Sequence, residues 1–290
     1  TIADSYYTLA MLDAQLEING RTLENWRNTV KTLEALKRVG KSNEAGVLQA
    51  KSSVMELEAS HLAILKSISE TENALSSVLA MPSQTIRRGN LSDAVFSDTI
   101  AIGVPLQLLS NRPDVRNAEM NLAQAFYATN MARAAFYPSI TLSGSLGWTN
   151  NGGGIITNPG QWLLNAIGAL TQPLFNRGTN IANLKIAKTR QEEARLLFQQ
   201  SLLDAGKEVN YALTAWQTAK SQIDISERQV ETLNEAVRKT QLLMRHSDTT
   251  YLEVLTAQQT LLNAEMTLAQ RRFDRIQAVI NLYHALGGGL

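Results

Sequence analysis

The sequence contains no cysteine and no long apolar run. Without cysteine the chain forms no disulfide, thiolate zinc site, iron–sulfur cluster or thiol nucleophile, and it offers no cysteine for lipidation. A membrane-spanning helix needs about 20 largely apolar residues in succession, and no such run occurs. Residues 1–4 lack the basic and apolar regions of a signal peptide, so we expect a mature protein or a fragment.

An excess of charge of either sign is also absent. The 27 Lys and Arg residues oppose 26 Asp and Glu residues, which leaves a formal net charge of +1. Nucleic-acid-binding proteins usually carry a basic face and a large positive charge, so we expect no nucleic-acid partner. Hydrophobic residues make up 44% of the chain, enough to build a core and to exclude a disordered protein.

Glycine and proline, which interrupt helices, are unevenly distributed. Between residues 179 and 246 the only one is Gly206, which allows one helix of about 100 Å at about 1.5 Å per residue. The stretches 1–39, 41–81 and 249–286 contain at most one glycine each and no proline. These four stretches predict two helical hairpins, whose turns lie near Gly40 and Ser247.

An internal repeat at an offset of 207 residues, from Ile2 to Val209, relates the two hairpins. Apolar residues recur every seven positions in both repeats, and small residues follow three positions later in the second. A strict seven-residue period predicts a left-handed supercoil, so we expect coiled-coil hairpins. The apolar series are Ile2, Leu9, Leu16, Leu23 and Val30, then Leu202, Val209, Trp216, Ile223, Val230, Val237 and Met244; the small residues are Ala205, Ala212, Ala219 and Ser226.

Residues 139–149 alternate between apolar and polar side chains, which predicts a β-strand. A glycine-rich loop and a second strand over 162–174 complete a β-hairpin. Eleven residues fit a tilted membrane strand of about 9–11 residues, with Trp148 and Trp162 as membrane-interface aromatics. A membrane tolerates no open strand edge, so other copies must pair with the hairpin. The alternative is a soluble hairpin that packs on helices.

Three motifs suggest other chemistry, and each has a simpler interpretation. Gly40-Lys41-Ser42 resembles the end of a phosphate loop, but Ala35 stands where that loop requires glycine and a helix precedes it. We therefore interpret Gly40 as a helix C-cap. Glu58 and His61 have the Glu-x-x-His spacing of di-iron bundles, but no second copy occurs, so we expect no metal or other cofactor. No catalytic constellation can be assembled, and we expect no enzyme.

Five segments in the correct order resemble the outer membrane efflux protein family of TolC-like channels, especially the branch that serves resistance-nodulation-division pumps. The resemblance covers nearly the whole chain, and these five segments are its clearest parts, with Ala118-Glu119 after the first of them. The segments are LSNRPDV at 109–115, ARAAFYPSI at 132–140, PLFNRG at 173–178, YLEVLTAQ at 251–258 and LYHALGGG at 282–289.

The resemblance implies a mainly α fold with a small β part: long antiparallel coiled-coil hairpins of an α-barrel, and a β-hairpin that contributes to a trimeric outer-membrane β-barrel. A family member carries two strand hairpins per chain, and this sequence begins inside the first repeat, so we expect an amino-terminal part outside it. The expected division is a helical hairpin at 1–82, an equatorial linker at 83–111, a helix opening the second repeat at 112–137, a membrane β-hairpin at 138–176, and the second helical hairpin with the C-terminus at 177–290.

By the same resemblance, the helix turns form the periplasmic tip, which narrows the pore and meets an adaptor protein. Glu253 aligns with an acid that lines the closed pore, where three copies would favour cations; a solvated acid at a helix start is the alternative. In the first repeat Gly46 takes the place that Glu253 has in the second, so the first repeat adds no acid to the pore. The pore-aperture residues are Met244, Thr249, Glu253 and Thr256, and the adaptor-contact residues are Val39, Gly40, Lys41, His246, Ser247 and Asp248.

The function that the resemblance implies is a passive exit duct of a tripartite efflux pump in the bacterial outer membrane, with its helical part in the periplasm. Its partners would be two further copies in a homotrimer, a periplasmic adaptor, an inner-membrane resistance-nodulation-division transporter and outer-membrane lipid. Two alternatives remain: the outer-membrane duct of a type I secretion system, and a soluble coiled-coil scaffold or adaptor without a pore.

Overall fold

The structure is a computed structural model that describes residues 2–40, 42–93, 112–149, 161–171, 177–246 and 251–288. The chain folds as two compact units, the first comprising Thr1–Pro105 with Lys207–Leu290 and the second Leu106–Gly206. Among the described residues, none of the helices is both long and apolar enough to cross a membrane.

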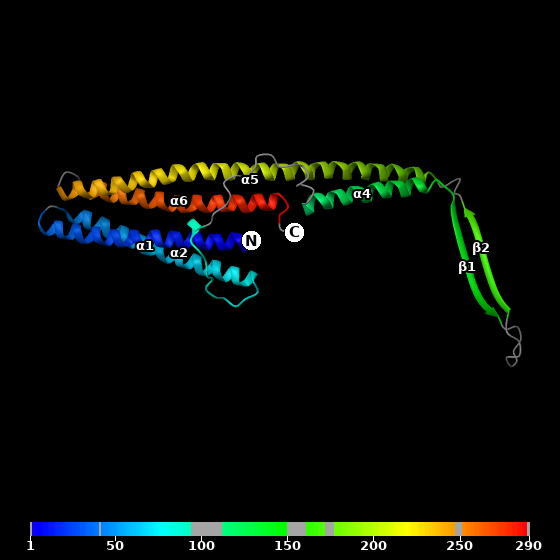
Figure 1. Cartoon of the computed structure of the whole chain (residues 1–290), viewed down its shortest axis with the longest axis horizontal. Helices are drawn as coiled ribbons and strands as arrows, with labels where there is room; N and C mark the ends of the chain where they lie inside the picture. The colour runs from blue at the N-terminus through cyan, green and yellow to red at the C-terminus, as the bar shows by residue number, and fades with distance from the viewer. Residues whose placement is uncertain are drawn as a thin grey trace, which may run out of the picture. The chain divides into compact units, whose positions relative to one another are not determined.

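The first unit contains helices that run back and forth along one another (Figure 1). They are α1 (Ile2–Arg38), α2 (Glu44–Val78), the short 3-10 helix η1 (Leu91–Asp93), the later part of α5 (Thr179–His246) and α6 (Tyr251–Ala285). Helix α1 contacts both α2 and α6. Arg272 of α6 donates a hydrogen bond of 2.9 Å to Glu227 of α5, so the order of helices in this unit is α2, α1, α6, α5.

The first hairpin turns where the sequence predicts. Gly40 has a φ of +73°, a conformation that glycine adopts without strain, and its N–H donates to the carbonyl of Lys37 at 3.0 Å. The side chain of Asn43 then accepts a hydrogen bond of 2.9 Å from the N–H of Gly46 and caps the start of α2. The C-cap interpretation of Gly40 is confirmed. The turn predicted near Ser247 lies outside the described residues.

The predicted seven-residue periodicity places side chains in the core. Leu9, Leu23, Val209, Trp216 and Ile223 are buried. The other members of the two series are partly buried, except Ile2, which is half exposed. All four small residues of the second repeat are buried as well: Ala205, Ala212, Ala219 and Ser226. The supercoiled-hairpin prediction is therefore confirmed where the side chains are described.

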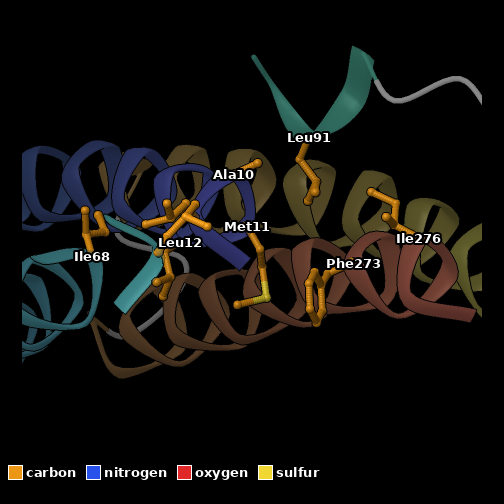
Figure 2. Close-up of a cluster of buried hydrophobic side chains, with 9 residues drawn as sticks. Ala10, Met11, Leu12, Ile68, Leu91, Phe273 and Ile276 are labelled. Atoms are coloured by element: carbon orange, nitrogen blue, oxygen red, sulfur yellow. The ribbon is translucent and has the colours of Figure 1, made fainter. Parts of the chain in front are cut away.

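Two apolar clusters hold the first unit together, and both combine residues of the two hairpins. The cluster at the base, where α2 ends and α6 nears its end, is shown in Figure 2; the other lies toward the tip. The base cluster contains Leu9, Ala10, Met11, Leu12, Ile68, Leu75, Leu91, Phe273 and Ile276. The tip cluster contains Leu23, Trp26, Leu33, Val47, Ala50, Leu57, Leu255 and Leu262.

The second unit contains α4 (Pro113–Ala134), the first part of α5, and strands β1 (Ser139–Thr149) and β2 (Gln161–Thr171). Thr129 of α4 is buried and donates to the carbonyl of Ala187 on α5 at 3.2 Å. The strands form a two-stranded antiparallel sheet that pairs Ser139 with Thr171 at one end and Thr149 with Gln161 at the other.

The predicted β-hairpin is thus confirmed, although β2 begins at Gln161, one residue before the predicted Trp162. Residues 172–174 of the predicted strand lie outside the described ones. The side chains of 139–145 and 168–171 are all exposed, so this part of the hairpin does not pack on helices.

Candidate functional site

The tip of the first helical hairpin and the start of α6 lie together and form the candidate site. Gly46, in the first turn of α2, is buried beneath the ring of Tyr251, the first residue of α6. A β-carbon built on Gly46 would lie 2.7 Å from Cζ of Tyr251 and within 2.9 Å of two further ring carbons. Real β-carbons do not make such short contacts, so this packing requires glycine at position 46.

Side chains below this contact extend it into a small core. Val47 and Ala50 of α2 and Leu255 of α6 are buried in the tip cluster, and Tyr251 packs against its edge. The two hairpins therefore meet at their tips through apolar contacts.

A buried polar pair ties α1 to α6 just below the tip. Gln258 donates from Nε2 to the hydroxyl of Thr29 at 3.3 Å, while that hydroxyl donates to the carbonyl of Asn25 at 3.1 Å. Both Thr29 and Gln258 are buried, and a buried polar group is costly unless it is paired. The pair therefore favours one register of α6 along α1.

Ion pairs on the surface of the tip join the two helices of the first hairpin. Lys37 pairs with Glu44 across the turn, and Lys51 lies 2.7 Å from Glu34. The hydrogen bond and the positive charge of Lys51 lower the pKa of Glu34. Because these groups face solvent, each pair contributes little to stability.

The structure places some of the residues that the resemblance assigns to the pore and the adaptor. Val39 and Gly40 are exposed at the turn, Glu253 and Thr256 are exposed in the first turns of α6, and Met244 is partly buried near the end of α5. The predicted residues Lys41, Ser247, Asp248 and Thr249 lie outside the described residues, as does the side chain of His246, whose backbone ends α5.

Trp148 and Trp162 occupy directly opposite positions of β1 and β2. Their side chains lie outside the described ones.

Glu58 and His61 have partners other than a metal. Arg27 of α1 donates to Glu58 at 2.6 Å, and Nδ1 of His61 lies 3.2 Å from Oδ1 of the buried Asn19. His61 therefore interrupts the apolar seam between α1 and α2 as a polar partner of Asn19.

Sequence reasoning missed the contact between Gly46 and Tyr251 and the pair of Thr29 and Gln258. In the sequence, Gly46 stands only as the position where the first repeat lacks the acid of the second. A lone glycine inside a strongly helical stretch does carry a signal, because such a glycine often permits a close approach. The sequence alone contains no indication of which ring approaches it.

Helical hairpins with heptad seams and an exposed β-hairpin define a fold shared with solved outer-membrane channels. A crystal structure of CusC, described as showing conformational changes during folding and transmembrane channel formation, matches with a TM-score of 0.89 and 31% identity, over 99% of this chain and 67% of that chain. In sequence, the cation efflux system protein CusC of Escherichia coli strain CFT073 is 33% identical over 294 residues, which cover 99% of this chain and 63% of that protein.

The pyoverdine export outer membrane protein OpmQ of Pseudomonas putida is 31% identical, over 100% of this chain and 61% of its own length. The profile of the outer membrane efflux protein family matches residues 104–288. The chain therefore belongs to the outer membrane efflux protein family, and it spans somewhat less than two thirds of the length of these two relatives. Membership assigns it to the bacterial outer membrane, with a helical part in the periplasm.

Proposed function

We propose that the chain forms part of the outer-membrane exit duct of a tripartite efflux pump, through which small compounds pass passively from the periplasm to the exterior. Family membership supports this proposal, and the observation that carries it is that the helical layer and the β-hairpin both have open edges. In this proposal the chain catalyses no reaction, and an inner-membrane transporter supplies the energy.

Among the helices that the structure describes in the first unit, the layer has two open ends. In the order α2, α1, α6, α5, the helices α1 and α6 each have a neighbour on both sides, whereas α2 and α5 are terminal. Helix α2 carries a second stripe at seven-residue spacing, formed by Leu48, Met55 and Leu62, which are all exposed. A helix with two such stripes packs against two neighbours, and the second neighbour of α2 is in this proposal a helix of another copy.

An interface that joins two different edges of one protein generates a closed ring when its rotation closes. Contact between α2 of one copy and α5 of the next is of this kind. The helical layers of three copies would then close into a hollow cylinder, and the assembly would be a homotrimer.

The β-hairpin has the amphipathic character of strands in an outer-membrane β-barrel. Ile140 pairs with Leu170 across the strands, Leu142 lies on the same face, and all three are exposed. On the other face β1 is polar, with serine or threonine at 139, 141, 143 and 145, and the hydroxyls of Ser139 and Thr171 lie 2.8 Å apart. Apolar residues facing lipid and polar residues facing a lumen are the pattern of membrane barrels. In the proposed trimer, hairpins of neighbouring copies cover both open edges, with Trp148 and Trp162 at a membrane interface.

The helix tips would form the periplasmic entrance. Glu253 is the proposed acid of the pore ring, with Met244, Thr249 and Thr256 beside it. An adaptor protein would contact the exposed turn at Val39 and Gly40, together with Lys41 and the residues 246–248 of the second turn. The proposal divides the chain into five parts. They are a helical hairpin at 1–82, an equatorial linker at 83–111, a helix opening the second repeat at 112–137, a membrane β-hairpin at 138–176, and the second helical hairpin with the C-terminus at 177–290.

The cargo is proposed only as small compounds or ions. The names of the two relatives refer to different cargoes, cations and pyoverdine, and a wide duct need not bind what it conducts. Selectivity then resides in the inner-membrane transporter, which for this branch of the family would be of the resistance-nodulation-division type.

The molar mass of the detergent-solubilised protein, measured by light scattering, tests the proposal. It should be measured on this chain and on a chain extended to its natural amino terminus. A trimer from the extended chain supports the duct, and a trimer from both shows that the helical layer assembles by itself. Monomers or dimers from both chains would overturn the duct and favour a coiled-coil scaffold.

A further inference from the structure

The internal repeat relates the contact between α1 and α6 to a contact between the two outer helices of the layer. The offset of 207 residues carries α1 onto the last part of α5, and it carries α2 onto α6. The pair of α1 and α6 therefore has a counterpart in the pair of α5 and α2. Because α2 and α5 are the terminal helices of the layer that the structure describes, this second pair forms only where two copies meet.

An ion pair across the contact of α1 and α6 is repeated in the sequence. Arg21 of α1 donates to Glu265 of α6 at 2.6 Å. The residues that correspond to them at the offset of 207 are again an arginine and a glutamate, Arg228 on α5 and Glu58 on α2. The repeat thus keeps both members of an ion pair, and it keeps each of them on the corresponding helix.

Apolar residues beside this ion pair follow the same relation. Ile18 of α1 and Ala269 of α6 line the same pocket, and their counterparts are Ile225 on α5 and Leu62 on α2. Ile225 is 58% exposed and Leu62 is 67% exposed. Two further residues that are buried on α6 have exposed counterparts on α2: Leu255 corresponds to Leu48, and Leu262 corresponds to Met55. The outer helices therefore expose the positions at which α1 and α6 meet.

Glu58 and Arg228 each have room for a further partner. Glu58 accepts a hydrogen bond of 2.6 Å from Arg27 with one oxygen, and its side chain is 45% exposed. A carboxylate has two acceptor oxygens, so it can bind a second guanidinium. Arg228 is exposed and donates from Nε to the carbonyl of Asp224 in its own helix at 3.3 Å. That bond uses one of the five N–H groups of a guanidinium.

The buried polar pair that favours one register of α6 along α1 is not repeated. The counterparts of Thr29 and Gln258 are Ala236 on α5 and Lys51 on α2, and Lys51 pairs with Glu34 of its own hairpin. Alanine has no side-chain polar group, so these positions cannot form the same hydrogen bond. The arginine and glutamate are therefore the polar contact that the repeat retains for the outer helices.

We propose that α2 and α5 of neighbouring copies pack in the register of α6 and α1, so that Arg228 of one copy pairs with Glu58 of the next and Ile225 lies against Leu62. In this interface Glu58 lies between two arginines, Arg27 of its own copy and Arg228 of the neighbour. The inference rests on the proposed function for the ring of copies, and it adds the residues and the register of the interface.

Cross-linking between introduced cysteines tests this register in the detergent-solubilised protein, with this chain and with the chain extended to its natural amino terminus. The sequence has no cysteine of its own. Chains with only Ile225→Cys and chains with only Leu62→Cys carry different tags, are co-expressed, and are treated with a short bismaleimide. Because each chain has one cysteine, every cross-link joins two chains. This pair leaves both Arg228 and Glu58 in place.

The mixture should give several-fold more cross-linked dimer with both tags than either variant gives alone. A chain that carries both Arg21→Cys and Glu265→Cys is the positive control, because these two positions already meet within one chain. Cross-links of Leu62→Cys with itself at a similar yield would show that α2 contacts α2, and they would overturn the pairing of unlike helices.

Two control positions test the register. Thr218→Cys and Thr232→Cys lie one heptad before and after Ile225, and both are exposed. One heptad displaces a residue by about 10 Å along the helix, so each should cross-link to Leu62→Cys several-fold less than Ile225→Cys does. An equal or higher yield from either position would overturn the proposed register.

The ion pair is tested in the same assay. Arg228→Gln, added to the chain with Ile225→Cys, removes the charge and should lower the yield of the cross-link several-fold. Glu58→Gln, added to the chain with Leu62→Cys, should have the same effect, and the two changes together should cost little more than one. Yields that do not respond to either change would reject the pairing of Arg228 with Glu58.

The molar mass of the same samples separates this inference from the proposed duct. A trimer without the cross-link between positions 225 and 62 would reject the register and leave the duct. The cross-link in an assembly other than a trimer would support the register and reject the ring of three. Monomers without any cross-link between chains would reject both.

Discussion

The ring of Tyr251 lies on the backbone of Gly46, with Cζ 2.7 Å from the point where a β-carbon would stand. The internal repeat makes this contact informative. At the offset of 207 residues, Glu44 is the counterpart of Tyr251, and Glu253 is the counterpart of Gly46. Glu44 pairs with Lys37 inside its own hairpin, whereas Tyr251 reaches the other hairpin. The two repeats therefore differ at the tip, although they share their heptad pattern.

Gly46→Ala should destabilise the protein by about 1–3 kcal/mol, because the new methyl group displaces the ring of Tyr251 from the tip core. Gly20→Ala is the matched control: it also replaces a glycine inside a helix, and its β-carbon would have no neighbour within 4 Å. That change should stabilise by about 0.5–1 kcal/mol through helix propensity. Unfolding in denaturant, followed by circular dichroism, measures both.

A double variant identifies the cause of this effect. If the ring of Tyr251 causes the loss of stability, Gly46→Ala should change the free energy of unfolding much less in a Tyr251→Ala background than in the wild type. Equal costs of Gly46→Ala with and without Tyr251 would show that the ring contact is not responsible.

The helices and their seams were predictable because their signals are local. The spacing of glycine and proline indicates the length of a helix. The seven-residue series indicate the face that each helix buries, as Leu9 and Leu23 do on α1 and Val209, Trp216 and Ile223 do on α5. The turn at Gly40 follows from the same rules. The alternation of residues 139–149 predicted β1 in the same way.

The contacts between hairpins were not predictable, because they depend on which surfaces meet. Arg88 stands beside Arg87 in the sequence, and only the fold brings Asp13, 75 residues away, to its guanidinium. Asn19 and His61 each interrupt an apolar series, and the sequence does not indicate that they contact each other. The candidate site combines such contacts, so sequence reasoning located the tip but not the residues that hold it together.

Gly40→Val should impair adaptor docking more than trimer formation. A β-branched residue is strained at a φ of +73°, and it would deform the exposed turn without entering either apolar cluster. Gly40→Asn is the control, because asparagine tolerates positive φ better than other residues with a side chain. Adaptor affinity and trimer content, measured on the same samples, check the prediction. Full adaptor affinity in Gly40→Val would remove this turn from the docking surface.

Asp114→Asn should weaken the second unit in a pH-dependent way. The hydrogen bond from Arg112, at 2.7 Å, is the main cause that lowers the pKa of Asp114. A carboxyl whose pKa is lowered by folding stabilises the protein above its unfolded pKa, and this contribution disappears as the pH falls through the lower, folded value. Asp114 is half exposed, so the cost at neutral pH should be at most about 1 kcal/mol.

Denaturation of the wild type and of Asp114→Asn at a series of acidic pH values measures this contribution. The two stabilities should converge as the pH falls below the ordinary range of an aspartate. A gap of constant size at every pH would show that the charge of Asp114 is not its cause.

Glu253→Ala should raise the ion conductance of the reconstituted protein or weaken its block by cations, without loss of the trimer. The reason is electrostatic: three carboxylates around a narrow pore attract cations and hold them there, and removal of the carboxylates weakens this cation-binding ring. Glu24→Ala is the control, because it removes one exposed acid per chain from the middle of α1, away from the tips. Single-channel recording in symmetrical salt, with and without a multivalent cation, measures both effects. If Glu253→Ala leaves conductance and block unchanged in an intact trimer, Glu253 is a surface acid at the start of α6, where the helix dipole favours a negative charge.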